Sequence, residues 1–175
     1  MEEIPGEERC LLLLARHGVP ERVISHSRKV TEIARRIAAP LLRRGLRLDM
    51  ELLTAAGLLH DVAKGSSRHA EVGMEIISAW GYPQVAAVVG SHIDIIPAKD
   101  APPGEAEILY LADKLVSGDR YIALEERFRE SEKRFSGDAE VATAIRRRFD
   151  SARLIKARIE HILGETVEAL WTRGE

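Results

Sequence analysis

Residues 52–65, LLTAAGLLHDVAKG, specify the fold, because a run of aliphatic and small residues ends in the pair His60-Asp61. Leu53, Ala56 and His60 recur at the i, i+3, i+7 spacing of one face of an α-helix. The pattern predicts a helix over residues 50–64 that turns His60 toward the interior of the protein.

Other segments carry side chains that bind metals, and their apolar periodicity points them to the same interior. His26 precedes Val30 and Ile33 at helical spacing in a segment that Pro20 opens. The same reasoning applies to His69, His92 and Asp113. A single buried histidine is more often a hydrogen-bonded core residue than a ligand, so the prediction depends on the whole set.

The remaining helix signals predict an all-α, single-domain bundle with a buried site. Five helices carry the candidate ligands, and prolines and a glycine mark residues 95–105 as a loop. We expect residues 1–118 to form the metal-binding helical core and residues 119–175 a C-terminal helical extension of the same domain. Two helices separated by residues 136–138 make up this extension, which either packs outside the core or forms a homodimer contact.

The composition favours a soluble helical protein and excludes several partners. The chain has 175 residues, of which 45% are hydrophobic, 31% charged and 5% aromatic, and its formal net charge is -2. This charge provides no basic field for nucleic acid or an acidic membrane, and no apolar run has the ~20 residues of a membrane span. A single cysteine, Cys10, cannot form an internal disulfide, so we expect a cytoplasmic protein.

A metal ion is the simplest explanation for so many buried histidines and carboxylates. Their burial costs several kcal/mol in total unless each is paired, and one divalent cation can satisfy three or four of them. Imidazole and carboxylate ligands without a thiolate favour Fe, Mn, Zn, Co or Ni over Ca or Mg.

The order of these residues resembles the HD-domain superfamily of metal-dependent phosphohydrolases, over roughly residues 10–120. The family pattern of a helical His, a later His-Asp pair and a distant Asp is matched by His26, His60-Asp61 and Asp113. The local sequences look like the subgroup of bacterial symmetrical dinucleoside tetraphosphatases. They are more similar still to small HD proteins associated with molybdenum-cofactor nucleotidyltransferases; the segments concerned are residues 18–30, 55–65, 68–77, 85–94 and 108–121.

The resemblance implies one or two divalent transition-metal ions, with Fe or Mn favoured and Zn, Co or Ni also allowed. The first ion would be held by His26, His60, Asp61 and Asp113. In members with two ions, Asp61 would bridge them, and His69 and His92 would hold the second. The implied reaction is hydrolysis of a phosphate ester or anhydride of a small molecule, with a nucleotide favoured, by a metal-activated water.

Three single basic residues and one run of arginines have both a functional and an ordinary interpretation. Lys64 lies one helical turn after the His-Asp pair, where it could act in catalysis or bind phosphate, or could offset the helix dipole. Arg68 and Arg120 flank proposed ligands and could bind substrate phosphate, or could be solvated surface residues. The run Arg146-Arg147-Arg148 is better explained as a solvated helix face than as an RNA site.

Two other functions remain open for such a chain. The same arrangement serves di-iron oxygenases of the superfamily, which iron content and O₂ uptake would distinguish from a hydrolase. A non-catalytic nucleotide sensor or partner protein would use the pocket for binding only.

Overall fold

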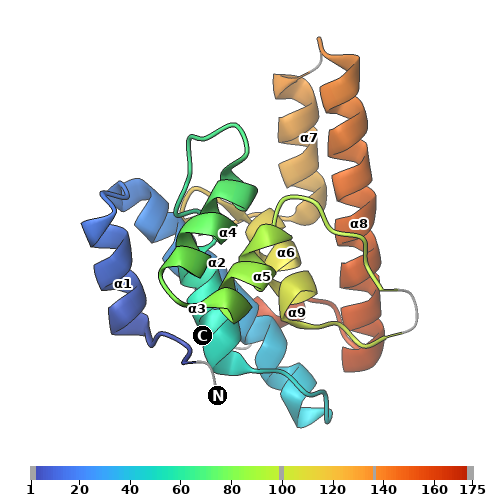
Figure 1. The fold of residues 1–175 in the computed structure, drawn as a ribbon. Coiled ribbons are helices and arrows are strands. Elements are labelled where there is room, and N and C mark those ends of the chain that lie inside the picture. Colours follow the sequence, from blue (N-terminus) through green and yellow to red (C-terminus); the bar gives the residue numbers. More distant parts are fainter. Residues whose placement is uncertain (1–2, 99–100, 136, 173–175) are drawn as a thin grey trace.

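A computed structural model describes residues 3–98, 101–135 and 137–172. These residues form nine helices and one β-hairpin of two-residue strands, which confirms the all-α prediction (Figure 1). The elements are α1 (Glu7–Arg16), α2 (Glu21–Arg43), α3 (Met50–Leu59), α4 (His69–Ala79), α5 (Pro83–Gly90), α6 (Glu105–Lys114), β1 (Val116–Ser117), β2 (Arg120–Tyr121), α7 (Leu124–Arg134), α8 (Ala139–Leu163) and α9 (Ala169–Thr172).

The core lies where α2, α3 and α6 pack together. Each of these helices presents an aliphatic stripe, and Ile37, Leu53 and Leu109 are completely buried. Helices α4 and α5 pack against each other and α5 also contacts α3, so α2, α3, α5 and α6 surround one interior. The candidate ligands lie in or next to these helices, as the sequence predicts.

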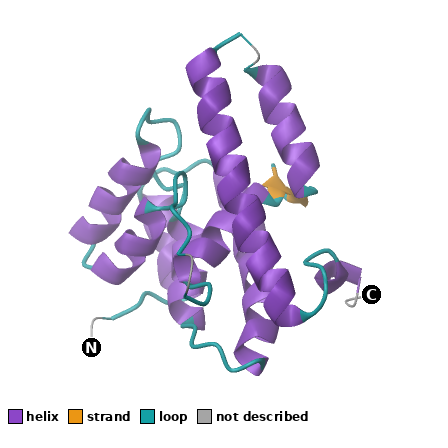
Figure 2. Ribbon diagram, turned by 90° about the vertical axis from the view of Figure 1, so that its right-hand side faces the viewer, coloured by secondary structure: helices purple, strands orange, loops and turns teal. Residues whose placement is uncertain are grey.

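Helices α7 and α8 form an antiparallel hairpin. The lower part of α8 packs against α6 and α2, whereas the far end of the hairpin rises beyond the other helices (Figure 2). Asp138 caps α8 by accepting hydrogen bonds from the backbone N–H groups of Glu140 and Val141, at 3.0 and 3.1 Å. The assignment of residues 119–175 to an extension of the same domain stays a prediction.

Helix α3 is shorter than predicted, ending at Leu59 rather than Lys64. The chain continues in tight turns, with backbone bonds from Val62 N to Leu59 O and from Lys64 N to Asp61 O, at 3.0 and 2.9 Å. Adjacent residues of a regular helix point about 100° apart. His60 keeps helical dihedral angles, φ -57° and ψ -33°, so His60 and Asp61 border the site from these neighbouring directions.

Two other helix ends and one hairpin differ from the prediction. Helix α5 ends at Gly90, so His92 lies in the turn that follows it. The long final helix ends at Gly164, whose φ of 70° ends α8 before the short α9. The β1–β2 hairpin was not predicted, because strands of two residues leave no alternating pattern. Predicted features at residues 99–100, 136 and 173–175 lie outside the described residues.

No helix in the described part of the chain is both long and apolar enough to cross a membrane.

Candidate metal centre

Asp61 lies at the centre of the cluster, and its two oxygens face different histidines. Oδ2 lies 3.7 Å from His26 Nε2 and 3.6 Å from His60 Nε2. Oδ1 lies 3.6 Å from His69 Nε2 and 3.7 Å from His92 Nε2. Because each oxygen has its own pair of imidazoles, Asp61 is positioned to bridge two ions.

Asp113 completes the first half of the cluster. Its Oδ1 lies 3.2 Å from His26 Nε2 and 3.7 Å from His60 Nε2. Ligand bonds of about 2.0–2.2 Å place neighbouring ligands of one ion about 3.0–3.6 Å apart. The observed separations are close to this range, so the side chains are spaced as ligands around a metal would be.

Backbone carbonyls orient three of the four imidazoles by accepting a hydrogen bond from Nδ1–H. The pairs are His26 with Gly118 at 2.7 Å, His60 with Gly57 at 2.8 Å and His92 with Val89 at 2.7 Å. A carbonyl can only accept, so Nδ1 carries a proton in each ring, and Nε2 is the ring nitrogen that faces the cluster. This arrangement is typical of metal-binding histidines.

Several polar atoms of the cluster are buried without a hydrogen-bond partner among the described residues, namely Nε2 of His60, His69 and His92 and Oδ1 of Asp61. Each unsatisfied buried polar atom costs about 1–3 kcal/mol. A cation would satisfy all of them at once, so the residues present fit a divalent metal. Two groups could each hold an ion: His26, His60 and Asp61, and Asp61, His69 and His92.

Charge and burial keep the ligands in the states that metals require. Burial opposes ionisation of Asp61, but His60 and His92 outweigh it and hold the pKa of this carboxyl below its usual range. Burial likewise opposes ionisation of Asp113, and Lys114 is the largest influence that lowers its pKa. Burial lowers the pKa of His69 and of His92, which favours neutral imidazoles.

The pKa of His60 behaves differently from that of the other cluster histidines. Burial alone would lower it, but the carboxylates of Asp61 and Asp113 outweigh burial, and the net pKa is raised. A metal at this position would compete with a proton for the same Nε2 atom.

Two lysines contact the cluster carboxylates. Lys64 Nζ donates to Asp61 Oδ2 at 2.8 Å, so it lies beside the site as predicted, and its catalytic and phosphate-binding roles stay predictions. Lys114 is buried and donates to Asp113 Oδ2 at 2.6 Å and to the His92 carbonyl at 3.0 Å. Lys114 was not predicted, because its place next to Asp113 in the sequence does not show that its side chain turns inward.

A cavity of about 530 Å³ opens beside the first half of the cluster. Helix α2, the loop after α5, the end of α6 and the α7–α8 hairpin all contribute to its lining. The lining includes the ligands His26, Asp61 and Asp113, the cations Arg22, Lys64, Lys114, Arg127 and Arg148, and the apolar Val23, Ile93, Phe128, Phe135, Val141 and Ile145.

The two predicted phosphate-binding arginines lie elsewhere. The Arg68 side chain is 73% exposed and pairs with Glu71, and Arg120 is exposed on β2; neither lines the cavity. The expectation of a solvated face at 146–148 is wrong for Arg148, which lines the cavity and donates to Asp94 at 2.8 and 3.1 Å. Sequence periodicity alone does not show how α8 is rotated against the core.

Comparison with known proteins places this cluster in a family. The model of the HD domain matches residues 23–118, which contain all six candidate ligands. The chain is 32% identical over 140 residues to a tRNA (cytidine(56)-2'-O)-methyltransferase of Thermoplasma volcanium, a match that covers 70% of this chain and 40% of that protein. The chain thus spans less than half the length of this relative. No solved structure matches the chain.

Two further relatives have different names. An uncharacterised protein of Methanocaldococcus jannaschii is 29% identical over 144 residues, covering 73% of this chain and 85% of that protein. A ribonuclease Y of Aquifex aeolicus is 29% identical over 142 residues, covering 73% of this chain and 24% of that protein. The activities in these names differ. The family model spans more than half of the 175 residues, so the chain belongs to the HD domain family.

Proposed function

We propose that the protein is a metal-dependent phosphohydrolase that cleaves a phosphate ester or anhydride of a small molecule, with a nucleotide as the favoured substrate. The observation that carries the proposal is the Asp61 carboxylate, which lies between two sets of imidazoles beside a cavity lined by cations. When bound there, divalent ions would activate water and neutralise charge on the phosphoryl group.

The protein's own residues would position the phosphate. Lys64 and Lys114 line the cavity, but both are already paired with cluster carboxylates. Arg22 and Arg127 line it as well, and neither forms a salt bridge with a carboxylate of the described chain. Guanidinium groups are suited to bidentate phosphate binding, so these two arginines are the available phosphate ligands.

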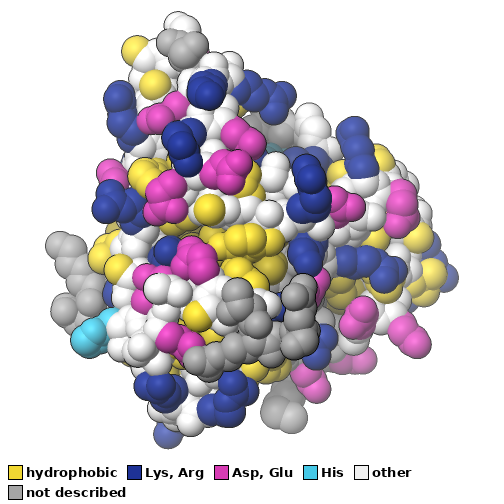
Figure 3. Space-filling model, turned by 180° about the vertical axis from the view of Figure 1, so that it is seen from behind, with side chains coloured by type: hydrophobic (Ala, Val, Ile, Leu, Met, Phe, Trp, Pro, Cys, Tyr) yellow, Lys and Arg dark blue, Asp and Glu magenta, His cyan; other side chains and the backbone are white. Residues whose placement is uncertain are grey.

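The cavity favours a small substrate over a long nucleic acid. Pockets of roughly 300–1,000 Å³ hold ligands of drug or nucleotide size, and this one has about 530 Å³. The molecular face in Figure 3 intersperses basic with acidic side chains and shows no continuous basic stripe. The names of two relatives, a tRNA methyltransferase and a ribonuclease, nevertheless make RNA a necessary competitor in the assay.

The experiment is metal analysis of anaerobically purified protein, combined with a phosphate-release screen in the presence of Mn or Fe. The screen contains nucleoside mono-, di- and triphosphates, a dinucleoside tetraphosphate, a sugar phosphate and a short RNA. We expect close to two metal equivalents and release from a nucleotide, with both lost in Asp61→Ala. His161→Ala is a matched control, because this histidine is exposed on α8.

Other outcomes would contradict the proposal. Bound iron with O₂ uptake and no phosphate release would indicate the oxygenase. Nucleotide binding without turnover under every metal would indicate the sensor. Wild-type metal content and activity in Asp61→Ala would show that the cluster is not the active site.

A further inference from the structure

The α7–α8 hairpin supplies one wall of the cavity beside the metal centre. Seven of its residues line the cavity: Arg127, Phe128, Ser131, Phe135, Val141, Ile145 and Arg148. The family model ends at residue 118, so the hairpin lies outside the part of the chain that matches the family. The metal ligands and this wall therefore come from separate parts of the sequence.

The wall is predominantly apolar and contains two aromatic rings. Phe128 is 7% exposed, and its ring lies 4.6 Å from that of Phe149, which holds it in place. Phe135 lines the cavity and is 44% exposed, with the Arg134 guanidinium over its ring at 5.6 Å from the centroid, so part of the ring remains accessible. Ile145 is buried and adds aliphatic surface to the same wall. Exposed aromatic surface beside a polar centre is suited to a planar apolar group.

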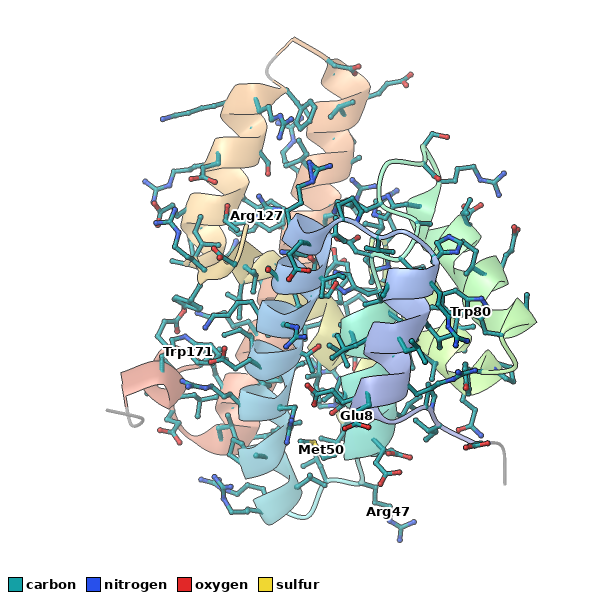
Figure 4. The ribbon with its side chains drawn as sticks, turned by 90° about the vertical axis from the view of Figure 1, so that its left-hand side faces the viewer. Glu8, Arg47, Met50, Trp80, Arg127 and Trp171 are labelled. Atoms are coloured by element: carbon teal, nitrogen blue, oxygen red, sulfur yellow. The ribbon has the colours of Figure 1, made fainter. Side chains whose placement is uncertain are left out.

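The lining of the cavity also carries positive charge. Arg127 extends from α7 near the start of α2 (Figure 4). Arg22 belongs to the first turn of α2, and both arginines line the cavity. Arg148 forms a salt bridge with Asp94. Lys64 pairs with Asp61, and Lys114 pairs with Asp113. A ligand in the cavity would thus meet the metal centre, the guanidinium groups of Arg22 and Arg127, and the aromatic rings of the hairpin.

We propose that the hairpin determines substrate specificity, by binding the base of a mononucleotide-sized substrate against Phe135 and Phe128 while Arg127 binds its phosphate. This inference rests on the proposed function and specifies which part of the substrate the hairpin recognises. A cavity of about 530 Å³ accommodates one nucleoside with its phosphate, and a second nucleoside would lie outside the apolar wall.

The test compares two substrates that share the reacting bond, AMP and ribose 5-phosphate, with metal-loaded protein. Only AMP has a base. Stacking of one base on an aromatic side chain changes affinity roughly 5- to 150-fold, so we expect kcat/KM for AMP to exceed that for ribose 5-phosphate by a factor in this range. Phe135→Ala should raise KM for AMP by a similar factor with kcat unchanged, and should leave ribose 5-phosphate unaffected.

Matched variants separate this effect from loss of folding. Leu154→Ala removes an exposed apolar side chain from α8, 45% exposed, that does not line the cavity, so neither substrate should respond. Arg127→Gln should raise KM for both substrates, because both carry the phosphate. Arg129→Gln on the same helix should change neither, because this arginine is exposed outside the cavity.

Each contrary result identifies which idea fails. Equal kcat/KM for AMP and ribose 5-phosphate would overturn the specificity role and leave the hydrolase intact. An equal gain from hexyl phosphate would show an apolar rather than a planar preference and would also overturn it. Release of phosphate from none of these compounds would count against the proposed function.

A binding measurement tests the wall without turnover. Calorimetry with the phosphonate analogue of AMP, whose P–C bond is not hydrolysed, should show binding that Phe135→Ala weakens roughly 5- to 150-fold. The phosphonate analogue of ribose 5-phosphate should bind more weakly and should not respond to this substitution. Failure of the wild-type protein to bind the AMP analogue, or an unchanged affinity in Phe135→Ala, would refute the inference.

Discussion

Gly57 should be the least replaceable glycine of the described helices, because an added Cβ atom has less space there than at Gly73 or Gly90. A Cβ atom added at Gly57 would lie 2.6 Å from Thr31 Oγ1 and 3.2 Å from both the Cα and the Cβ of Thr31. Thr31 cannot simply rotate away, since its hydroxyl donates to the Ser27 carbonyl at 2.8 Å and its Cα belongs to the backbone of α2. Gly57→Ala must therefore push α3 and α2 apart.

The magnitude follows from two opposing contributions. Overpacking of a well-packed core costs about 1–3 kcal/mol, and replacing glycine by alanine in a helix interior returns up to about 1 kcal/mol. We expect Gly57→Ala to lower the free energy of unfolding by about 1–2 kcal/mol. It should also weaken metal binding, because the Gly57 carbonyl accepts the hydrogen bond that orients His60.

Gly73→Ala in α4 is the matched control. Its added Cβ would meet Val62 Cγ1 at 3.4 Å, an ordinary contact, so this variant should be neutral or up to about 1 kcal/mol more stable. The assay is urea unfolding of both variants in the presence of a chelator, followed by metal titration of the folded proteins. If Gly57→Ala is as stable as Gly73→Ala, the close packing of α2 on α3 is not limiting and the reasoning is wrong.

Three further predictions concern the metal, a buried lysine and the cysteine. Chelation should lower the melting temperature by roughly 5–10 °C if metal is present at about 100 times its Kd, and an unchanged melting curve after verified metal removal would contradict this. Lys114→Met should cost about 3–5 kcal/mol in metal-free protein, because the Asp113 carboxylate stays buried without its counter-charge. The cost should be smaller with metal bound, and equal losses in the two forms would refute the idea. Burial, and secondarily Glu7, raise the pKa of the Cys10 thiol to about 12, so iodoacetamide at pH 8 should label it only after unfolding. Because an unfolded thiol ionises near pH 8.5, stability should fall as pH rises from there toward 12; rapid labelling of folded protein would contradict the burial.

Local patterns predicted much of the helical core. Val30 and Ile33 share a helical face with His26, and both are buried, as this spacing indicates. Burial of side chains on one helix depends mainly on a periodicity that the sequence displays directly. The positions of His60 and Asp61 in one site were also expected, although the tight turns that follow Leu59 were not.

The basic residues around the site could not be predicted in the same way. Arg68 and Arg120 are close to ligands in the sequence, yet their side chains point to the surface. Arg127 and Arg148 are far from every ligand in the sequence and nevertheless line the cavity. Long charged side chains adopt many rotamers, and the direction of each depends on neighbours that only the folded chain brings together.

The helical class, the family and the six candidate ligands can all be predicted from the sequence, because residue types, short-range periodicity and the order of motifs carry this information. Other features become visible only in the folded chain: the two oxygens of Asp61 face separate histidine pairs, Lys114 is buried against Asp113, and the α7–α8 hairpin closes one side of the cavity. These features depend on packing between segments far apart in the chain. Such packing is set by the fit of whole helix surfaces, which no local pattern records.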